Sequence, residues 1–267
     1  MKNRLLVVVS DLHCGSEVGL SPRRFTLRNG NVVTIGDNLV QQWLADQWEY
    51  SIARVASIIG HDPATLLVNG DATEGVHHRN NKELIAAEMD RHLDMANAVL
   101  EPLAKLCRKR FVVRGTECHT AELENILAQE LKAETRTARD KWLLEIAGCL
   151  VDAAHHMSTT GRAYLEASAM GIFMGNARLN YARMGHTIPK VFLRAHRHCG
   201  GWFCDGTGLL AVTGAWQFLT RHGLKVVTDS IPSPTVMVLD WRGKKDGELP
   251  EVHEIKSIPP KAEITRV

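Results

Sequence analysis

Short apolar runs alternate along this chain with longer segments whose apolar residues recur at helical spacing. Runs that predict buried strands occupy residues 5–9, 64–69, 111–113, 142–154 and 191–194, with two or three more strands expected within 209–241. Segments that predict helices occupy residues 37–59, 81–107, 121–131 and 163–184, the first of them capped by Asp37. This alternation predicts α/β layering.

The remaining segments show no sustained apolar period. Residues 16–36 predict a long loop or a small hairpin, and residues 250–267, which are polar and contain Pro259-Pro260, predict a surface tail. No linker rich in Pro, Gly and Ser divides the chain. We therefore expect one domain over residues 1–267.

The composition is that of an ordinary globular protein. The 267 residues are 45% hydrophobic and 23% charged, which suffices for a large core without disulfides. A net charge of +2 is too close to zero to imply a polyanionic partner by itself. The first apolar run is too short for a signal peptide and nothing approaches a membrane span, so we expect a cytoplasmic protein without a membrane partner.

Side chains that can bind metals follow five of the predicted strands. They are Asp11 and His13; Asp71; Thr116, Glu117, Cys118 and His119; His155 and His156; and His196 and His198. Any one of these groups, taken alone, would be equally well explained by a solvated turn. Because the carboxyl ends of strands in α/β sheets border the ligand crevice, five groups together predict one shared site.

The donor types indicate which cations this site would hold. Asp and His without an obligatory thiol favour Mn²⁺, with Fe, Zn²⁺ or Ni²⁺ as alternatives, and disfavour Ca²⁺. The number of donors exceeds the needs of one ion. We therefore expect two divalent ions about 3.5–4 Å apart, bridged by one carboxylate.

The order of these motifs resembles that of the calcineurin-like metallophosphoesterases. The matching stretches are Asp11-Leu12-His13, Gly70-Asp71, Gly115-Thr116-Glu117-Cys118-His119, His155 and Ala195-His196-Arg197-His198. With Gly214-Ala215-Trp216 they look most like phage and prophage members. The resemblance implies an αββα sandwich of two mixed β-sheets flanked by helices. It also implies hydrolysis of phosphoesters, in which a water that bridges two metals attacks phosphorus.

The resemblance further implies a role for each position. The ligands would be Asp11, His13 and His198 for the first metal, Asp71 for both metals, and His155 and His196 for the second metal. His156 stays an alternative to His155.

One motif departs from the family pattern. Where most members have Gly-Asn-His-Asp or Gly-Asn-His-Glu, Thr116 occupies the position of the Asn ligand. Because a hydroxyl is a poorer ligand, we expect Glu117 to supply the missing oxygen and His119 to protonate the leaving group. Thr116 itself stays the alternative ligand. In the alternative, the second metal site is weak and the protein is a non-catalytic scaffold of the same fold.

Loop residues near the motifs are candidates for substrate binding. Arg114 and Arg197 can hold the phosphate, His77 and His78 can bind a further phosphate, and Trp202 and Trp216 can stack on a base. The alternatives are exposed loop side chains and core aromatics. We expect a phosphodiesterase for a small diester or nucleotide, with nucleic acid as a further possible substrate and a phosphomonoesterase as the alternative.

Three cysteines, Cys14, Cys118 and Cys199, each lie one residue from a proposed ligand or acid. The first interpretation is that Cys serves as a small apolar residue in a tight turn. The second is that a thiol lies near the metals and can capture Zn²⁺ or be oxidised.

Overall fold

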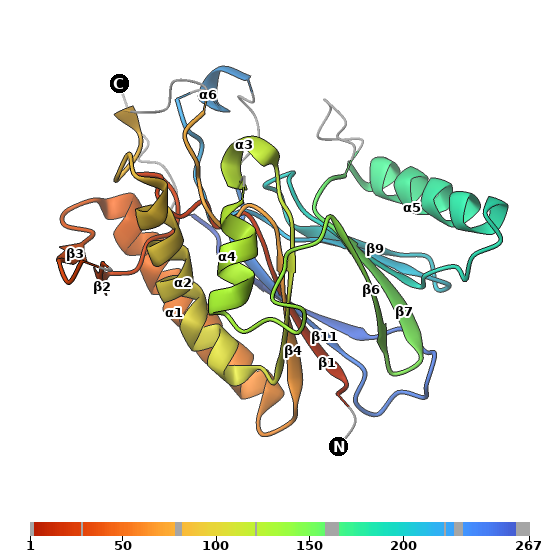
Figure 1. The fold of residues 1–267 in the computed structure, drawn as a ribbon. Coiled ribbons are helices and arrows are strands. Elements are labelled where there is room, and N and C mark those ends of the chain that lie inside the picture. Colours follow the sequence, from red (N-terminus) through yellow and green to blue (C-terminus); the bar gives the residue numbers. More distant parts are fainter. Residues whose placement is uncertain are drawn as a thin grey trace, which may run out of the picture.

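Two five-stranded sheets face each other between helices in this protein (Figure 1). The structure, a computed structural model, describes residues 3–27, 29–77, 82–120, 122–157, 166–221, 223–226 and 232–259. His78, a candidate for substrate binding, lies outside the described residues. The two facing sheets and their flanking helices confirm the expected α/β sandwich of two mixed sheets flanked by helices.

The first sheet has the strand order β12-β11-β1-β4-β5. Its strands are β1 (Leu5–Val9), β4 (Ala64–Asn69), β5 (Lys109–Val113), β11 (Thr235–Asp240) and β12 (Glu251–Lys256). β1, β4 and β5 are parallel to one another, whereas β11 is antiparallel to β1 and β12 is antiparallel to β11. Every residue of β1 is buried, as expected for a central strand covered on both faces.

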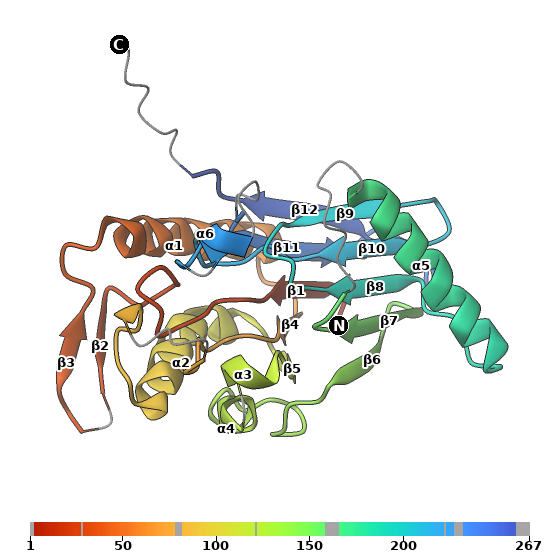
Figure 2. The same ribbon diagram turned by 90° about the horizontal axis from the view of Figure 1, so that it is seen from above.

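The second sheet has the order β6-β7-β8-β10-β9 and lies beside the first (Figure 2). Its strands are β6 (Lys141–Ile146), β7 (Cys149–Ala154), β8 (Val191–Arg194), β9 (Gly201–Cys204) and β10 (Leu209–Val212). β7, β8 and β10 are parallel, and the edge strands β6 and β9 are antiparallel to their neighbours. A small hairpin, β2 (Arg24–Thr26) with β3 (Val32–Thr34), lies apart from both sheets.

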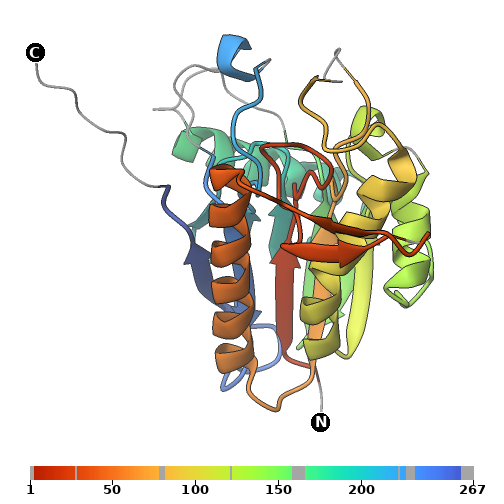
Figure 3. The ribbon, with the colours of Figure 1, turned by 90° about the vertical axis from the view of Figure 1, so that its left-hand side faces the viewer.

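Helices cover the outer faces of both sheets (Figures 2 and 3). α1 (Leu39–Ile59), α2 (Met89–Leu106) and α4 (Leu123–Glu130) lie on the side of the first sheet, and α5 (Glu166–Arg183) lies on the side of the second. α3 (Glu117–Thr120) and α6 (Gly223–Val226) are single turns within loops. None of the described helices is long and apolar enough to cross a membrane.

Alternate residues of β1 contribute to two different cores. Leu5, Val7 and Val9 pack in the core that also contains apolar residues of α1, α2 and α4. Leu6 and Val8 face the other way, into the core between the two sheets. This follows from the two-residue period of a strand, which sends successive side chains to opposite faces.

Several boundaries differ from those expected. The N-cap of α1 is Asn38 rather than Asp37, because the Asn38 side chain accepts hydrogen bonds from the backbone N–H groups of Val40 and Gln41. α2 begins at Met89, well after the expected residue 81. The expected surface tail from residue 250 is wrong over 251–256, since these residues form β12 and pair along their whole length with β11.

Candidate metal centre

The loops after the strands hold their functional side chains in a strained backbone conformation. Eight non-glycine residues of the described chain have positive φ, and five of them are expected ligands. They are Asp11 (50°), His13 (49°), Asp71 (52°), His196 (70°) and His198 (59°). Left-handed backbone is costly for residues with a Cβ and concentrates at functional sites, so the strain indicates this edge of the two sheets as the candidate site.

Backbone hydrogen bonds between the loops set the positions of these residues. The N–H of Asp11 donates to Gly70 O at 2.9 Å, and the N–H of His13 donates to Asp71 O at 3.1 Å. Between two loops of the second sheet, the N–H of Ala195 donates to His155 O at 2.8 Å. The loop after β1 is therefore in register with the loop after β4, and the loop after β7 is in register with the loop after β8.

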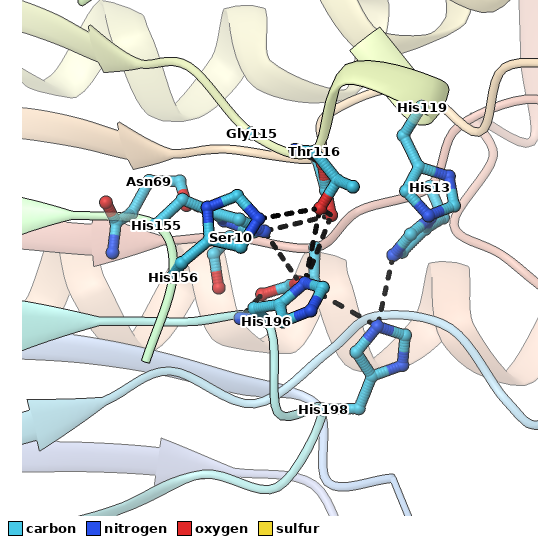
Figure 4. Close-up of polar contacts among 12 residues, drawn as sticks. Ser10, His13, Asn69, Gly115, Thr116, His119, His155, His156, His196 and His198 are labelled. Carbon is cyan, nitrogen blue, oxygen red and sulfur yellow. Dashed lines mark hydrogen bonds and ion pairs between the residues drawn. The ribbon is translucent and has the colours of Figure 1, made fainter. Parts of the chain in front are cut away.

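Asp and His side chains from both sheets form overlapping groups whose ligand atoms lie within 4.8 Å of one another. The groups are Asp11, His13 and His198; Asp11, Asp71 and His155; and His155, His156 and His196. Figure 4 shows the imidazoles of His13 and His198 on one side of Thr116 and those of His155 and His156 on the other. The structure thus brings together nearly all of the expected donors, from both sheets.

Asp11 Oδ1 tests whether these residues fit a cation. This buried oxygen accepts no hydrogen bond, although it lies 3.8 Å from His198 Nε2 and 3.9 Å from His155 Nε2. A buried carboxylate oxygen without a partner is costly. A divalent cation held by Asp11 and these histidines would satisfy it, so the residues fit the expected metal site.

The tautomer of His155 leads to the same conclusion. Its Nδ1 lies 2.7 Å from Asn69 O and must carry a proton, because a carbonyl only accepts. In the neutral ring the lone pair is then on Nε2, which lies 2.9 Å from Asp71 Oδ2. Burial opposes protonation of this ring, but the carboxylates of Asp11 and Asp71 outweigh it and raise the pKa of His155 to about 9. The position next to Asp71 therefore calls for a positive charge, either a proton or a cation.

Asp71, which forms a group with Asp11 and His155, accepts two hydrogen bonds from Thr116. The Thr116 N–H donates to Asp71 Oδ1 at 2.6 Å, and the Thr116 hydroxyl donates to Asp71 Oδ2 at 3.1 Å. Burial alone would raise the pKa of Asp71, but His155 and His196 outweigh it and hold this pKa well below its usual range. Asp71 is therefore a buried anion.

The position of Thr116 differs sharply from that of Glu117. The Thr116 hydroxyl also lies 3.2 Å from His196 Nδ1 and 3.3 Å from His156 Nε2, two members of the group of His155, His156 and His196. Glu117 is exposed and belongs to none of the potential metal-binding groups among the described residues. The structure therefore places Thr116, the alternative, beside these histidines, and not Glu117, the residue expected to replace the usual Asn.

Glu74 lies at the candidate site, although the motif analysis gave it no role. It is buried, and its Oε2 lies 2.9 Å from His13 Nδ1 and 2.7 Å from Gln217 Nε2. Its Oε1 lies 3.2 Å from His77 Nε2. Burial acts to raise the pKa of Glu74, but His13 and His77 outweigh it and hold the pKa well below its usual range. Its place three residues after Asp71 was the available signal.

His119 lies beside His13, a member of the group of Asp11, His13 and His198. Its Nδ1 is 2.7 Å from Glu74 O, and its ring meets the His13 ring edge-on at 4.7 Å between centroids. Burial, and then the positive charge of His13, lower the pKa of His119 to about 4. The free protein therefore keeps this ring neutral, with its proton on Nδ1 and its lone pair on Nε2.

Glu124, on α4, is a second residue that the sequence did not reveal. Its Oε2 accepts from the Gly115 N–H at 2.6 Å and its Oε1 accepts from the Ala72 N–H at 3.5 Å. It therefore joins the loop of Asp71 to the loop of Thr116. Burial, and then the charge of Asp71, raise the pKa of Glu124 to about 8.

The expected substrate-binding residues separate into several environments. Arg114 makes an ion pair with Asp140 at 2.8 Å. Arg197, which is flanked in the sequence by His196 and His198, is partly buried. Trp202 is 48% exposed on β9. His77 joins the site through Glu74, as described above.

Trp216 is a core residue, so its expected role in stacking on a base is wrong. The side chain is fully buried and meets Trp48 edge-on at 4.7 Å between ring centroids. Its Nε1–H donates to Thr235 O at 3.3 Å. No face of the ring is left for a substrate. The structure therefore agrees with the alternative interpretation, in which Trp216 is a core aromatic.

The three cysteines near the ligands also differ. Cys14 is fully buried, and burial raises the pKa of its thiol far above the usual range, as expected for a cysteine that fills a tight turn. Cys199 is partly buried. Cys118 is exposed, and it forms a further potential metal-binding group with His77 and His119.

No family model matches the sequence, and no curated protein matches it. Among solved structures, the fold is similar to zinc-bound wild-type Vps29 from Entamoeba histolytica, with 12% identity over 94% of this chain and 98% of that chain and a TM-score of 0.44. It is also similar to a novel archaeal phosphodiesterase (13% identity, 95% of this chain and 99% of that chain, TM-score 0.43). A predicted phosphoesterase from Streptococcus pneumoniae TIGR4 shows 12% identity over 95% of this chain and 99% of that chain, with a TM-score of 0.38. At such identities and TM-scores nothing follows about activity, which must be inferred from the residues of this site.

Proposed function

We propose that this protein is a metal-dependent phosphoesterase that hydrolyses phosphodiesters, with a small diester or a nucleotide as its substrate. The observation that carries the proposal is the convergence of two buried carboxylates with histidines from both sheets, around the unpartnered oxygen Asp11 Oδ1. The calcineurin-like order of the motifs supports the same chemistry.

In this proposal two divalent cations are held by the groups described above. Asp11, His13 and His198 hold one of them, and Asp71, His155 and His196 hold the other, with the Thr116 hydroxyl or His156 as a further donor. Bound there, the cations would draw charge from the phosphoryl oxygens and make water more acidic.

The two carboxylates are both candidates for the bridging role. Asp71 is the bridge that the motif order implies. Asp11 Oδ1 is nevertheless the atom that lies between His155 and His198, at 3.9 and 3.8 Å from their Nε2 atoms. Asp11→Asn and Asp71→Asn separate the two possibilities, because loss of the bridge removes both metals and loss of a single-site ligand removes one.

His119 is the proposed general acid and Arg197 the proposed phosphate ligand. The 2.7 Å contact with Glu74 O holds His119 in one orientation and one tautomer. A proton must reach Nε2 before this ring can act as an acid. A bound anionic phosphate would favour that proton, since negative charge stabilises the imidazolium.

The decisive test is hydrolysis of bis-p-nitrophenyl phosphate and p-nitrophenyl phosphate by metal-free protein refilled with Mn²⁺, Ni²⁺ or Zn²⁺. We expect diester turnover that rises until two metals are bound per chain. Turnover of the monoester alone would make the protein a phosphomonoesterase. Absence of turnover with both sites filled would favour a non-catalytic scaffold.

Variants make this test specific to the site. Asp71→Asn should abolish turnover and lose bound metal, measured by equilibrium dialysis with elemental analysis. Asp37→Asn is the matched control, because Asp37 is exposed and lies outside the site. Normal metal binding by Asp71→Asn would contradict the proposed role of Asp71.

A further inference from the structure

A further group of donors lies next to the proposed dinuclear site. His77, Cys118 and His119 each offer one ligand atom, and these atoms lie within 4.8 Å of one another. The two imidazoles meet edge-on with 4.1 Å between their ring centroids. We propose that this His-Cys-His group is a separate binding site for Zn²⁺, and that Zn²⁺ bound there inhibits the enzyme by occupying His119.

Glu74 orients both imidazoles of the group. His77 Nε2 lies 3.2 Å from the Glu74 carboxylate oxygen Oε1, and His119 Nδ1 lies 2.7 Å from the Glu74 backbone oxygen. Both oxygens are acceptors, so each of these nitrogens carries a proton. The lone pairs are then on His77 Nδ1 and His119 Nε2. Metal-binding histidines are commonly supported in this way, by a carboxylate or a carbonyl at the other ring nitrogen.

The donors of this group favour Zn²⁺ over Mn²⁺, the cation that the Asp and His donors of the dinuclear site favour. Two imidazoles and one thiolate suit Zn²⁺, and three protein donors leave its fourth position open. Cys118 is exposed and both histidines are partly buried, so an ion can enter from solvent. The ionised carboxylate of Glu74, beside His77, supplies nearby negative charge.

On binding, the Cys118 thiol loses its proton to water and the sulfur forms a bond to the metal, with no change of oxidation state. His119 Nε2, the atom that would carry the acid proton, becomes a ligand. The inhibitory role therefore rests on the proposed function, whereas the site itself does not.

Co²⁺ absorption tests the site without reference to activity. A cysteine thiolate bound to Co²⁺ gives a near-ultraviolet charge-transfer band, which carboxylate and imidazole ligands do not give. Titration of the metal-free protein should produce this band in the wild type and in Cys204→Ser, which removes another exposed cysteine. Cys118→Ser should lack the band and bind one ion fewer per chain.

The contribution of His77 is measured in the same titration. Loss of a residue that merely supports a ligand weakens metal binding about 10- to 100-fold, so His77→Ala should raise the Co²⁺ dissociation constant at this site at least about tenfold. No band in the wild type, a band that persists in Cys118→Ser, or unchanged affinity in His77→Ala would overturn the site.

Inhibition is measured as the ratio of diester turnover with and without excess Zn²⁺, within each variant. Because a general acid contributes about 10²–10⁴-fold to rate, excess Zn²⁺ should reduce turnover at least about tenfold in the wild type and in Cys204→Ser. Cys118→Ser should escape most of this inhibition. Equal inhibition of all three proteins would overturn the inhibitory role, whereas an inactive wild type that shows the Co²⁺ band would contradict only the proposed function.

Discussion

Glu74 determines the states of several imidazoles at the residue scale. Its carboxylate contacts His13 and His77, and its backbone oxygen contacts His119. Through its carboxylate, Glu74 therefore sets the tautomers of a proposed metal ligand and of a donor to the proposed zinc site. Through its backbone oxygen it sets the tautomer of the proposed acid. Such fixed orientations are what a metal site requires of the residues that surround its ligands.

His119→Ala tests the acid role at this scale. We expect the variant to keep its metals and to lose turnover, most severely for alkyl esters, whose leaving oxygen needs a proton. Nitrophenyl esters should lose less, because nitrophenolate leaves without protonation. Steady-state kinetics with both ester classes measure the difference, and His186→Ala, an exposed histidine, is the control. Equal losses for the two classes would argue against an acid.

Trp216→Ala tests the assignment of this residue to the core. Removing a fully buried Trp side chain leaves a cavity, so the free energy of unfolding should fall by about 3–5 kcal/mol. Trp202→Ala is the matched comparison, because Trp202 is 48% exposed and surface substitutions usually change stability by about 0.5 kcal/mol or less. Urea denaturation measures both, and similar losses in the two variants would contradict the core assignment.

At the scale of elements, α4 does more than cover the first sheet. Through Glu124 it accepts hydrogen bonds from the loops that follow β4 and β5. These loops carry Asp71 and Thr116, which hydrogen-bond to each other. A helix of eight residues therefore holds together two of the loops that form the site.

Glu124→Gln should change how the stability of the metal-free protein depends on pH. The pKa of Glu124 is raised from 4.5 to about 8 in the folded protein. Its contribution to stability is thus complete below pH 4.5 and is lost as the pH rises through 8. This loss amounts to at most about 5 kcal/mol.

Denaturation between pH 5 and 8 measures the effect. The wild type should lose stability more steeply than Glu124→Gln as the pH rises. Glu122→Gln, at an exposed position near the beginning of α4, should follow the wild type. Parallel pH profiles for wild type and Glu124→Gln would show that Glu124 has an ordinary pKa.

At the scale of the whole molecule, the site joins the two sheets. Asp11 and Asp71 follow strands of the first sheet, whereas His155, His196 and His198 follow strands of the second. The parallel strands of both sheets direct their carboxyl ends to the same edge. A cation held by residues from both sheets binds the folded protein far better than the unfolded chain and therefore stabilises the fold.

Metal addition should accordingly raise the melting temperature of metal-free protein. At a free-metal concentration 100 times the dissociation constant, each site adds about 2.7 kcal/mol to the free energy of unfolding. Calorimetry should show this shift for the wild type and for Asp37→Asn, and a much smaller shift for Asp71→Asn. An unchanged melting temperature on metal addition would contradict a site shared between the sheets.

Local pattern determined much of this protein. Strands at 5–9, 64–69 and 191–194 could be predicted from the sequence, because buried strands are continuous apolar runs bounded by polar residues. The α/β class and the groups of donors that follow these strands could be predicted for the same reason. Each is a property of a few consecutive residues.

The tertiary structure decided what depends on distant residues. Glu74 and Glu124 gain their roles from partners on other loops, and Trp216 is buried because Trp48 on α1 packs against it. Residues 251–256 are polar in sequence yet form a strand, since β11 offers its free edge and pairing satisfies the backbone hydrogen bonds. Whether Thr116 or Glu117 lies at the site was likewise decided by the contact of the Thr116 loop with Asp71, which no local pattern contains.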